Sequence, residues 1–199
     1  MSNIDRATRT RHHILDAAWA LVMEQGASAS IADIAAAAGI TRQSVYVHFG
    51  SRGGLLMALL KRTDDRLGIF EAFSAALAEK DPAVRLARAV TVWLDFVREI
   101  VPVARDIVRL RASDEDAAAA WNDRMRELLK VWQQLARSLE ADGALAGGWS
   151  AADAADFIWM STSVQAYDLL TRDRRWAHKR ALHAIRQGVS RAVLHGGGA

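Results

Sequence analysis

Two short helical segments separated by a glycine are the feature that most constrains the fold of this chain. They read "SIADIAAAAG" from residue 30 and "ITRQSVYVHF" from residue 40. Ser30 and Thr41 are residue types that cap helix N-termini, and Asp33 follows Ser30 at the spacing of a capping box. Gly39 is the residue type that ends a helix in the left-handed conformation. The short connection predicts a helix-turn-helix, whose second helix is presented to the major groove of DNA.

Helical patterns continue on both sides of this motif. A preceding helix is expected over residues 5–25, and Gly26 is expected to end it. Further helices are expected at 51–79, 82–100, 102–113, 116–141, 151–171 and 174–195. The sequence therefore predicts an all-α fold of about nine helices. We expect residues 1–50 to form a three-helix, helix-turn-helix DNA-binding domain and residues 51–199 to form a helical bundle.

Basic residues are unevenly distributed along the chain. Residues 1–62 hold seven arginines and lysines against four acidic residues, whereas the two signs balance in the remainder. The net charge of +3 therefore lies in the first third of the sequence. A local basic surface is typical of a module that binds phosphate groups.

The runs "RHHILDAAWALVMEQG" and "SIADIAAAAGITRQSVYVHFGSRGGLL" together resemble the DNA-binding domain of the TetR family of bacterial transcriptional regulators. The matching residues are Arg11, Ile14, Leu15, Ala17, Ala18, Gly26, Ile34, Ala35, Ala38, Gly39, Tyr46, His48, Phe49 and Leu55. The resemblance covers residues 9–60. Three features depart from the family pattern: a shorter loop after Gly26, Gln43 in place of glycine, and "SRGG" in place of "SKEE".

Bases are expected to be read at the start of the second helix of the motif. Glutamine can bond adenine through two hydrogen bonds and arginine can bond guanine similarly, so Gln43 and Arg42 are candidates, with Ser44 behind them. Arg42 and Gln43 have the alternatives of phosphate contact or solvation. Thr41 either caps the helix alone or also meets a phosphate.

Phosphate contacts are expected around the motif. The resemblance implies that Tyr46 and His48 donate to phosphates, and that Arg52 meets one at the start of the next helix. His48 has the alternative of packing between helices. Candidates from the preceding segments are Arg9, Arg11 and Ser30; the two arginines can reach flanking phosphates or the minor groove, or remain free on the surface.

Gly53 and Gly54 stand in the first turn of the helix expected from residue 51. Glycine costs about 0.5–1 kcal/mol there relative to alanine. We hypothesise that the two glycines loosen the start of this helix and leave Arg52 mobile until DNA or a ligand fixes it.

The resemblance further implies a ligand-binding and dimerisation domain in residues 51–199. Aromatic and methionine side chains suit a pocket for an unknown apolar or aromatic effector, with a well-filled core as the alternative. The candidate pocket residues are Trp93, Phe96, Ile107, Trp121, Met125, Leu128, Trp132, Trp159 and Ser163. A palindromic operator requires a two-fold homodimer. The candidate interface residues, which can instead complete a monomer core, are Phe157, Met160, Val164, Leu182, Ile185 and Val189.

Several functional classes lack support in the sequence. The chain has no apolar run long enough to span a membrane, no signal-peptide pattern and no cysteine. It has no nucleophile-elbow, zinc-protease or phosphate-loop motif, so we expect no cofactor, no metal and no enzyme activity. The leading interpretation is a cytoplasmic, dimeric repressor that binds double-stranded DNA and is released by an effector. The alternatives are an all-helical enzyme or carrier with an incidental basic N-terminus, and a non-specific architectural DNA protein.

Overall fold

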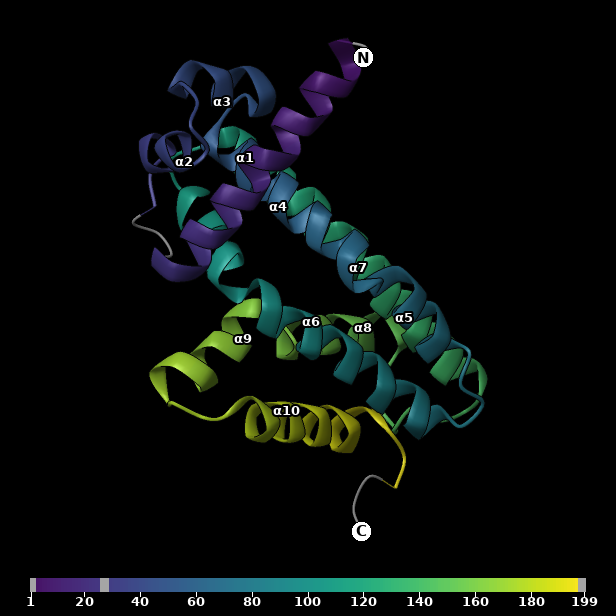
Figure 1. Ribbon diagram of the computed structural model, residues 1–199. Helices are drawn as coiled ribbons and strands as arrows, with labels where there is room; N and C mark the ends of the chain where they lie inside the picture. The colour runs from purple at the N-terminus through teal and green to yellow at the C-terminus, as the bar shows by residue number, and fades with distance from the viewer. Residues whose placement is uncertain (1–2, 26–28, 197–199) are drawn as a thin grey trace. The chain divides into compact units, whose positions relative to one another are not determined.

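Helices make up the regular structure of the computed structural model, which describes residues 3–25 and 29–196. In chain order they are α1 (Asn3–Gln25), α2 (Ile31–Ala37), α3 (Arg42–Phe49), α4 (Arg52–Leu67), α5 (Ile69–Leu77), α6 (Pro82–Leu110), α7 (Glu115–Ala141), α8 (Ala151–Ser161), α9 (Val164–Asp168), the π-helical turn η2 (Leu169–Asp173) and α10 (His178–Val193) (Figure 1). These two ranges contain no β-strand, only one isolated bridge between Leu145 and Leu194. The all-α prediction is confirmed. Gly26, the expected end of the first helix, lies outside the described residues.

The predicted helices are divided or joined differently at three places, and the last one begins at His178 instead of residue 174. The helix expected over 51–79 is broken at Gly68, whose φ of 58° lies in the left-handed region that glycine adopts without a steric penalty. The break expected before Pro102 is absent, because α6 runs through it. Ile100 and Val103 on either side of the proline are fully buried, and this burial outweighs the lost backbone hydrogen bond. The helix expected over 151–171 stops at Ser161, and Ser163 caps a new one.

The chain divides into two compact units. The first comprises Met1–Arg66 with Pro102–Asp123, and the second comprises Leu67–Val101 with Arg124–Ala199. Helices α6 and α7 therefore each contribute one end to each unit. The first unit is larger than the DNA-binding domain expected at residues 1–50, because it includes α4 and the segment 102–123.

The helix-turn-helix is built on the apolar core of the first unit. Ile14, Ala18 and Val22, at helical spacing on α1, are all fully buried. Leu55 and Leu59 bury the corresponding face of α4. Helices α2 and α3 add further buried residues to this core. They are Ile31, Ile34, Ala35, Val45 and Phe49. This burial fixes α2 and α3 on a platform of longer helices.

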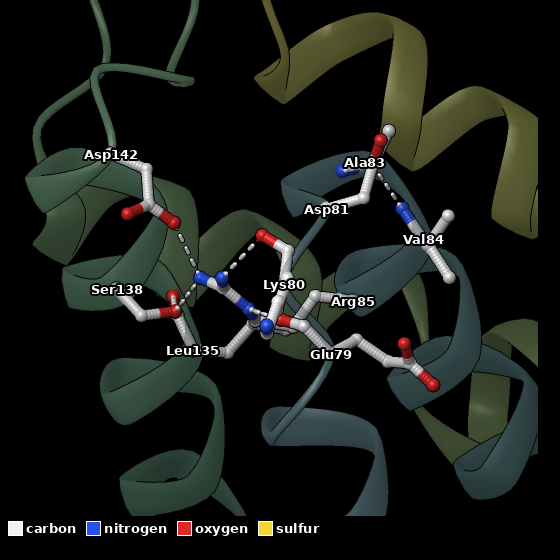
Figure 2. A network of polar contacts seen from close by, with 9 residues as sticks. All are labelled: Glu79, Lys80, Asp81, Ala83, Val84, Arg85, Leu135, Ser138 and Asp142. Carbon is white, nitrogen blue, oxygen red and sulfur yellow. Dashed lines mark hydrogen bonds and ion pairs between the residues drawn. The ribbon is translucent and has the colours of Figure 1, made fainter.

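A buried arginine organises one end of the second unit (Figure 2). The Arg85 guanidinium donates to the carbonyl oxygens of Glu79 and Lys80 at 2.7 and 3.1 Å. It also donates to Ser138 Oγ at 2.9 Å and forms an ion pair with Asp142 at 2.8 Å. The Arg85 side chain is only 9% exposed. One guanidinium therefore fastens the turn before α6 to the C-terminal part of α7.

Length and apolar character decide whether a helix can cross a membrane. None of the helices in 3–25 or 29–196 combines the length and the apolar character that crossing a bilayer requires.

Candidate functional site

The turn between α2 and α3 has the geometry that the sequence predicts. Gly39 has a φ of 61°, and the Ile40 N–H donates to the Ala35 carbonyl at 3.0 Å. Thr41 then caps α3, since its hydroxyl accepts from the Ser44 N–H at 3.1 Å. The turn is therefore closed by local hydrogen bonds, and the direction of α3 follows from it.

The inner face and the C-terminal end of α3 are held in place. Val45 and Phe49 are 1% and 9% exposed and pack into the core. From α1, the Arg11 guanidinium lies 4.3 Å from the centre of the Phe49 ring and donates to the His48 carbonyl at 2.6 Å. A cation at a helix C-terminus also complements the helix dipole. Arg11, which is predicted to meet DNA, thus also contacts and positions α3.

The outer face of α3 presents side chains to solvent. Arg42, Gln43 and Tyr46 are exposed, and Ser44 and His48 are half-buried. Val47, which the sequence analysis did not select, is 75% exposed. Val47 follows Gln43 by four residues, so the two side chains lie on one face of the helix. The sequence signal that could have identified Val47 is an apolar residue four positions after Gln43, on the polar face of α3.

Two hydroxyl candidates are occupied by helix caps. The Ser30 hydroxyl donates to Asp33 Oδ2 at 2.6 Å and accepts from the Asp33 N–H at 3.1 Å. The Ser30 N–H also donates to Asp33 Oδ2 at 2.9 Å, and the two hydrogen bonds that the carboxylate accepts from Ser30 lower the pKa of Asp33. The Thr41 hydroxyl lies 3.0 Å from Ser44 Oγ. Ser30 and Thr41 therefore act first as caps, and phosphate contact by either remains a prediction. Arg9 is exposed on α1.

Arg52 has two partners within the first unit. Its Nη1 donates to the Ala29 carbonyl, and its Nη2 lies 3.3 Å from Asp106 Oδ2. The Arg52 side chain is 19% exposed and that of Asp106 is 2% exposed. These contacts argue against the hypothesis of a mobile Arg52, and a phosphate contact by Arg52 remains a prediction. Burial raises the pKa of Asp106, although the nearby charges of Arg52, Arg109 and Arg105 act in the opposite direction.

The aromatic candidates of the second unit form a packed cluster. Trp93 stacks on Phe96 with ring centres 5.7 Å apart and on Phe73 at 6.5 Å, and Phe73 meets Trp132 edge-on at 5.6 Å. Phe73 is not among the predicted pocket residues. Trp93 Nε1 donates to the Thr162 carbonyl at 2.7 Å. We call Phe73, Trp93, Phe96 and Trp132 the aromatic cluster.

Two indole groups near the predicted pocket have unmet hydrogen-bonding capacity. The Nε1 atoms of Trp132 and Trp159 are buried without a hydrogen-bond partner among the described residues. Leu128 is buried and Met125 is half-buried, while the Ser163 hydroxyl accepts from the Ala166 N–H as the cap of α9. Two further pocket candidates, Ile107 and Trp121, belong to the first unit, where both are buried.

The dimerisation candidates separate into two groups. Met160 is 52% exposed, and Phe157 and Leu182 are half-buried. Val164, Ile185 and Val189 are at most 9% exposed within the single chain. These three fill the core of the second unit, which favours for them the alternative that they complete the core of a single chain. On α9 the structure adds no such candidate, but η2 begins with the exposed Leu169.

Comparison with known proteins finds a family match for the helix-turn-helix region. Residues 14–59 match the family described as "Bacterial regulatory proteins, tetR family". The match begins in α1 and ends in α4, and so contains the whole helix-turn-helix. This part of the chain is therefore similar to the DNA-binding region of TetR-family regulators.

A curated relative is also similar to part of the chain. A stretch of 77 residues is 38% identical to the HTH-type transcriptional regulator AcrR of Shigella flexneri, covering 38% of this chain and 36% of that protein. The chain thus matches only about a third of the length of this TetR-family relative.

Solved structures extend the likeness to the whole fold. A protein from Saccharomonospora viridis, crystallised in complex with choline, matches with a TM-score of 0.73 at 19% identity, over 94% of this chain and 99% of that one. NalD, the secondary repressor of the MexAB-OprM multidrug efflux pump in Pseudomonas aeruginosa, matches with a TM-score of 0.68 at 21% identity, over 97% and 100% of the two chains. At these identities the likeness concerns the TetR-family fold.

Proposed function

We propose that this protein is a DNA-binding transcriptional regulator, most simply a repressor, that binds a palindromic operator as a homodimer. The observation that carries the proposal is the outer face of α3. There Gln43, Tyr46 and Val47 are exposed on a helix that is capped at Thr41 and held at its other end by Arg11. A rigid, capped helix with a solvent-facing polar surface is what insertion into a major groove requires.

Gln43 and Val47 form the base-reading pair in this proposal. Glutamine can bond the N6 and N7 atoms of adenine, and an apolar side chain can contact the methyl group of thymine. Because the two residues share a face, they suit an A·T pair or two neighbouring pairs. Arg42 adds a further base or phosphate contact at the start of the helix.

Tyr46 and His48 fix the protein on the DNA backbone in this proposal. Tyr46 is 43% exposed, so its hydroxyl is accessible to a phosphate. His48 is half-buried at the end of α3, where its carbonyl is bound by Arg11. Such contacts set orientation without reading sequence.

Dimerisation is assigned to the exposed parts of α8 and α10. Phe157 and Met160 of α8 and Leu182 of α10 supply apolar surface. The exposed charges of the two helices are opposite in sign, with Asp156 on α8 and Arg180 on α10. A two-fold contact that places α8 of one copy beside α10 of the other therefore pairs unlike charges.

The effector is proposed to be a small aromatic or apolar molecule with a hydrogen-bond acceptor. The aromatic cluster offers ring surfaces, and the unpartnered Nε1 atoms of Trp132 and Trp159 offer donors. The choline complex of the Saccharomonospora viridis protein supports a small-molecule site in this fold. Since the cluster is packed and largely buried, a ligand must open it, and it favours release from DNA only by preferring that opened state.

A selection from random DNA duplexes at a stated salt concentration tests the proposal, because phosphate contacts make affinity salt-dependent. The expected result is a palindrome whose half-sites lie about one helical turn apart. Enrichment of no sequence would contradict specific recognition and favour a non-specific DNA protein. Absence of any DNA affinity at low salt would favour a carrier or enzyme. A regulator of this kind acts in the cytoplasm, where the DNA is.

A further inference from the structure

We propose that Arg52 and Asp106 form a positioning pair that sets the geometry of the recognition helix, and that Arg52 makes no phosphate contact. The inference rests on the proposed DNA-binding function. It assigns a role in DNA recognition to an acidic residue 54 positions along the chain, on α6 and far from the helix-turn-helix in sequence.

The contacts of Arg52 join three segments of the first unit. Arg52 is the first residue of α4, Ala29 precedes the Ser30 cap of α2, and Asp106 lies near the end of α6. One nitrogen of the guanidinium donates to the Ala29 carbonyl and the other lies 3.3 Å from the Asp106 carboxylate. The guanidinium therefore links the residue before the α2 cap to the start of α4 and to α6.

The backbone beside Arg52 has no room for a side chain. A Cβ atom on Gly53 would lie 2.6 Å from Ala117 Cβ, and one on Gly54 would lie 2.1 Å from the Phe49 carbonyl oxygen. Real Cβ atoms essentially never approach other atoms so closely. The two glycines thus permit close packing of α4 against the end of α3 and the start of α7. Close packing is therefore an alternative to the hypothesis that the two glycines loosen the helix.

Electrostatics keep the guanidinium in place. Asp106 is 2% exposed, and a buried carboxylate is stable in its charged form only beside cations and hydrogen-bond donors. Turning Arg52 toward a phosphate would withdraw a direct partner from this carboxylate. It would also leave the Ala29 carbonyl without the donor that binds it.

The sign of the Asp106 effect distinguishes this role from simple electrostatics. Removing a negative charge from a DNA-binding surface strengthens phosphate binding in the absence of other effects. If Asp106 positions Arg52, the isosteric change Asp106→Asn weakens specific DNA binding instead. Asp65→Asn is a matched control, because Asp65 is an exposed carboxylate on α4.

The test measures the affinity of the full chain for the duplex selected by the wild-type protein and for a scrambled duplex, from 50 to 300 mM salt. Arg52→Met and Asp106→Asn are each expected to lower the specific affinity about tenfold, the effect of one lost fixed contact. Affinity for the scrambled duplex and the slope of log affinity against log salt should stay near wild-type values. Asp65→Asn should leave the specific affinity unchanged or higher. The double variant Arg52→Met/Asp106→Asn should lose less than the two single losses combined.

Four results would overturn the inference. A salt slope reduced by about one in Arg52→Met would identify a phosphate contact. Tighter binding by Asp106→Asn would remove the positioning role, and equal losses on both duplexes would indicate a general loss of folded protein. Hydrogen exchange of the α2 amides without DNA gives an independent readout. Exchange should be faster in both single variants, and unchanged exchange would refute the positioning pair. This readout needs no DNA, so it tests the pair even if the wild-type protein bound no DNA. Absence of DNA binding by the wild type would instead refute the proposed function.

Discussion

Gly54→Ala should destabilise this protein, although alanine is the better helix former. The new Cβ atom would lie 2.1 Å from the Phe49 carbonyl oxygen, and it meets backbone that cannot rotate away. Phe49 is buried and is held by the Arg11 guanidinium above its ring, so α3 yields little. Relief requires a shift of about 1 Å, and overpacking of this kind costs about 1–3 kcal/mol.

The gain from replacing glycine in a helix offsets part of this cost. That gain is about 0.5–1 kcal/mol, which leaves a net loss of about 0–2.5 kcal/mol, near 1 kcal/mol at mid-range. For a chain of this size a loss of about 1 kcal/mol lowers the melting temperature by roughly 2–4 °C. Gly188→Ala in α10 is the matched control, because nothing lies within 4 Å of its added Cβ. It should raise the melting temperature by roughly 1–4 °C.

Thermal unfolding followed by circular dichroism, with urea titration of the same variants, measures both effects. A Gly54→Ala protein as stable as the wild type, beside a stabilised Gly188→Ala protein, would refute the packing argument. That outcome would show slack at the start of α4, as the sequence alone suggested.

Three further predictions concern stability and DNA binding. Arg85→Met removes four polar contacts and should cost about 2–4 kcal/mol in urea unfolding, whereas Arg88→Met, at a half-exposed ion pair, should cost less than about 1 kcal/mol; equal losses would contradict the role of burial. Tyr46→Phe should weaken binding to all duplexes by the same factor, and a changed sequence preference would exclude a pure phosphate contact. Because the pKa of Asp106 is raised, its contribution to the unfolding free energy falls as pH rises from the unfolded to the folded pKa. The wild type should therefore lose stability over that range relative to Asp106→Asn, and parallel pH profiles would contradict the raised pKa.

The helix-turn-helix could be predicted from sequence because its signals are local. The capping box of Ser30 and Asp33, the cap at Thr41 and the left-handed Gly39 all appear in the structure as expected. Each depends on residues within four positions of one another, so a single sequence contains the whole signal.

The role of Arg52 could not be predicted in the same way. Its partner Asp106 is 54 residues away in the sequence, and no local sequence pattern predicts that the two side chains interact. The packing that requires Gly53 is also long-range, since the contacting residue is Ala117. A family resemblance placed a basic residue at the correct helix start but could not show which partner it binds.

Helical periodicity also leaves open what covers an apolar face. On α10 the spacing identified Leu182, Ile185 and Val189 equally well, yet two of these are buried by the chain itself. Similarly, Pro102 carries a strong local signal against helix, and the burial of its neighbours overrides it. Tertiary packing decided both cases.

Base reading by the outer face of α3 is tested by a parallel selection from random duplexes with the wild type, Gln43→Ala and Val47→Ala at one salt concentration. Each variant is expected to lose preference at one or two positions of every half-site, with the remaining positions and the half-site spacing unchanged. Recovery of the same palindrome with the same preferences by all three proteins would contradict base reading by this face.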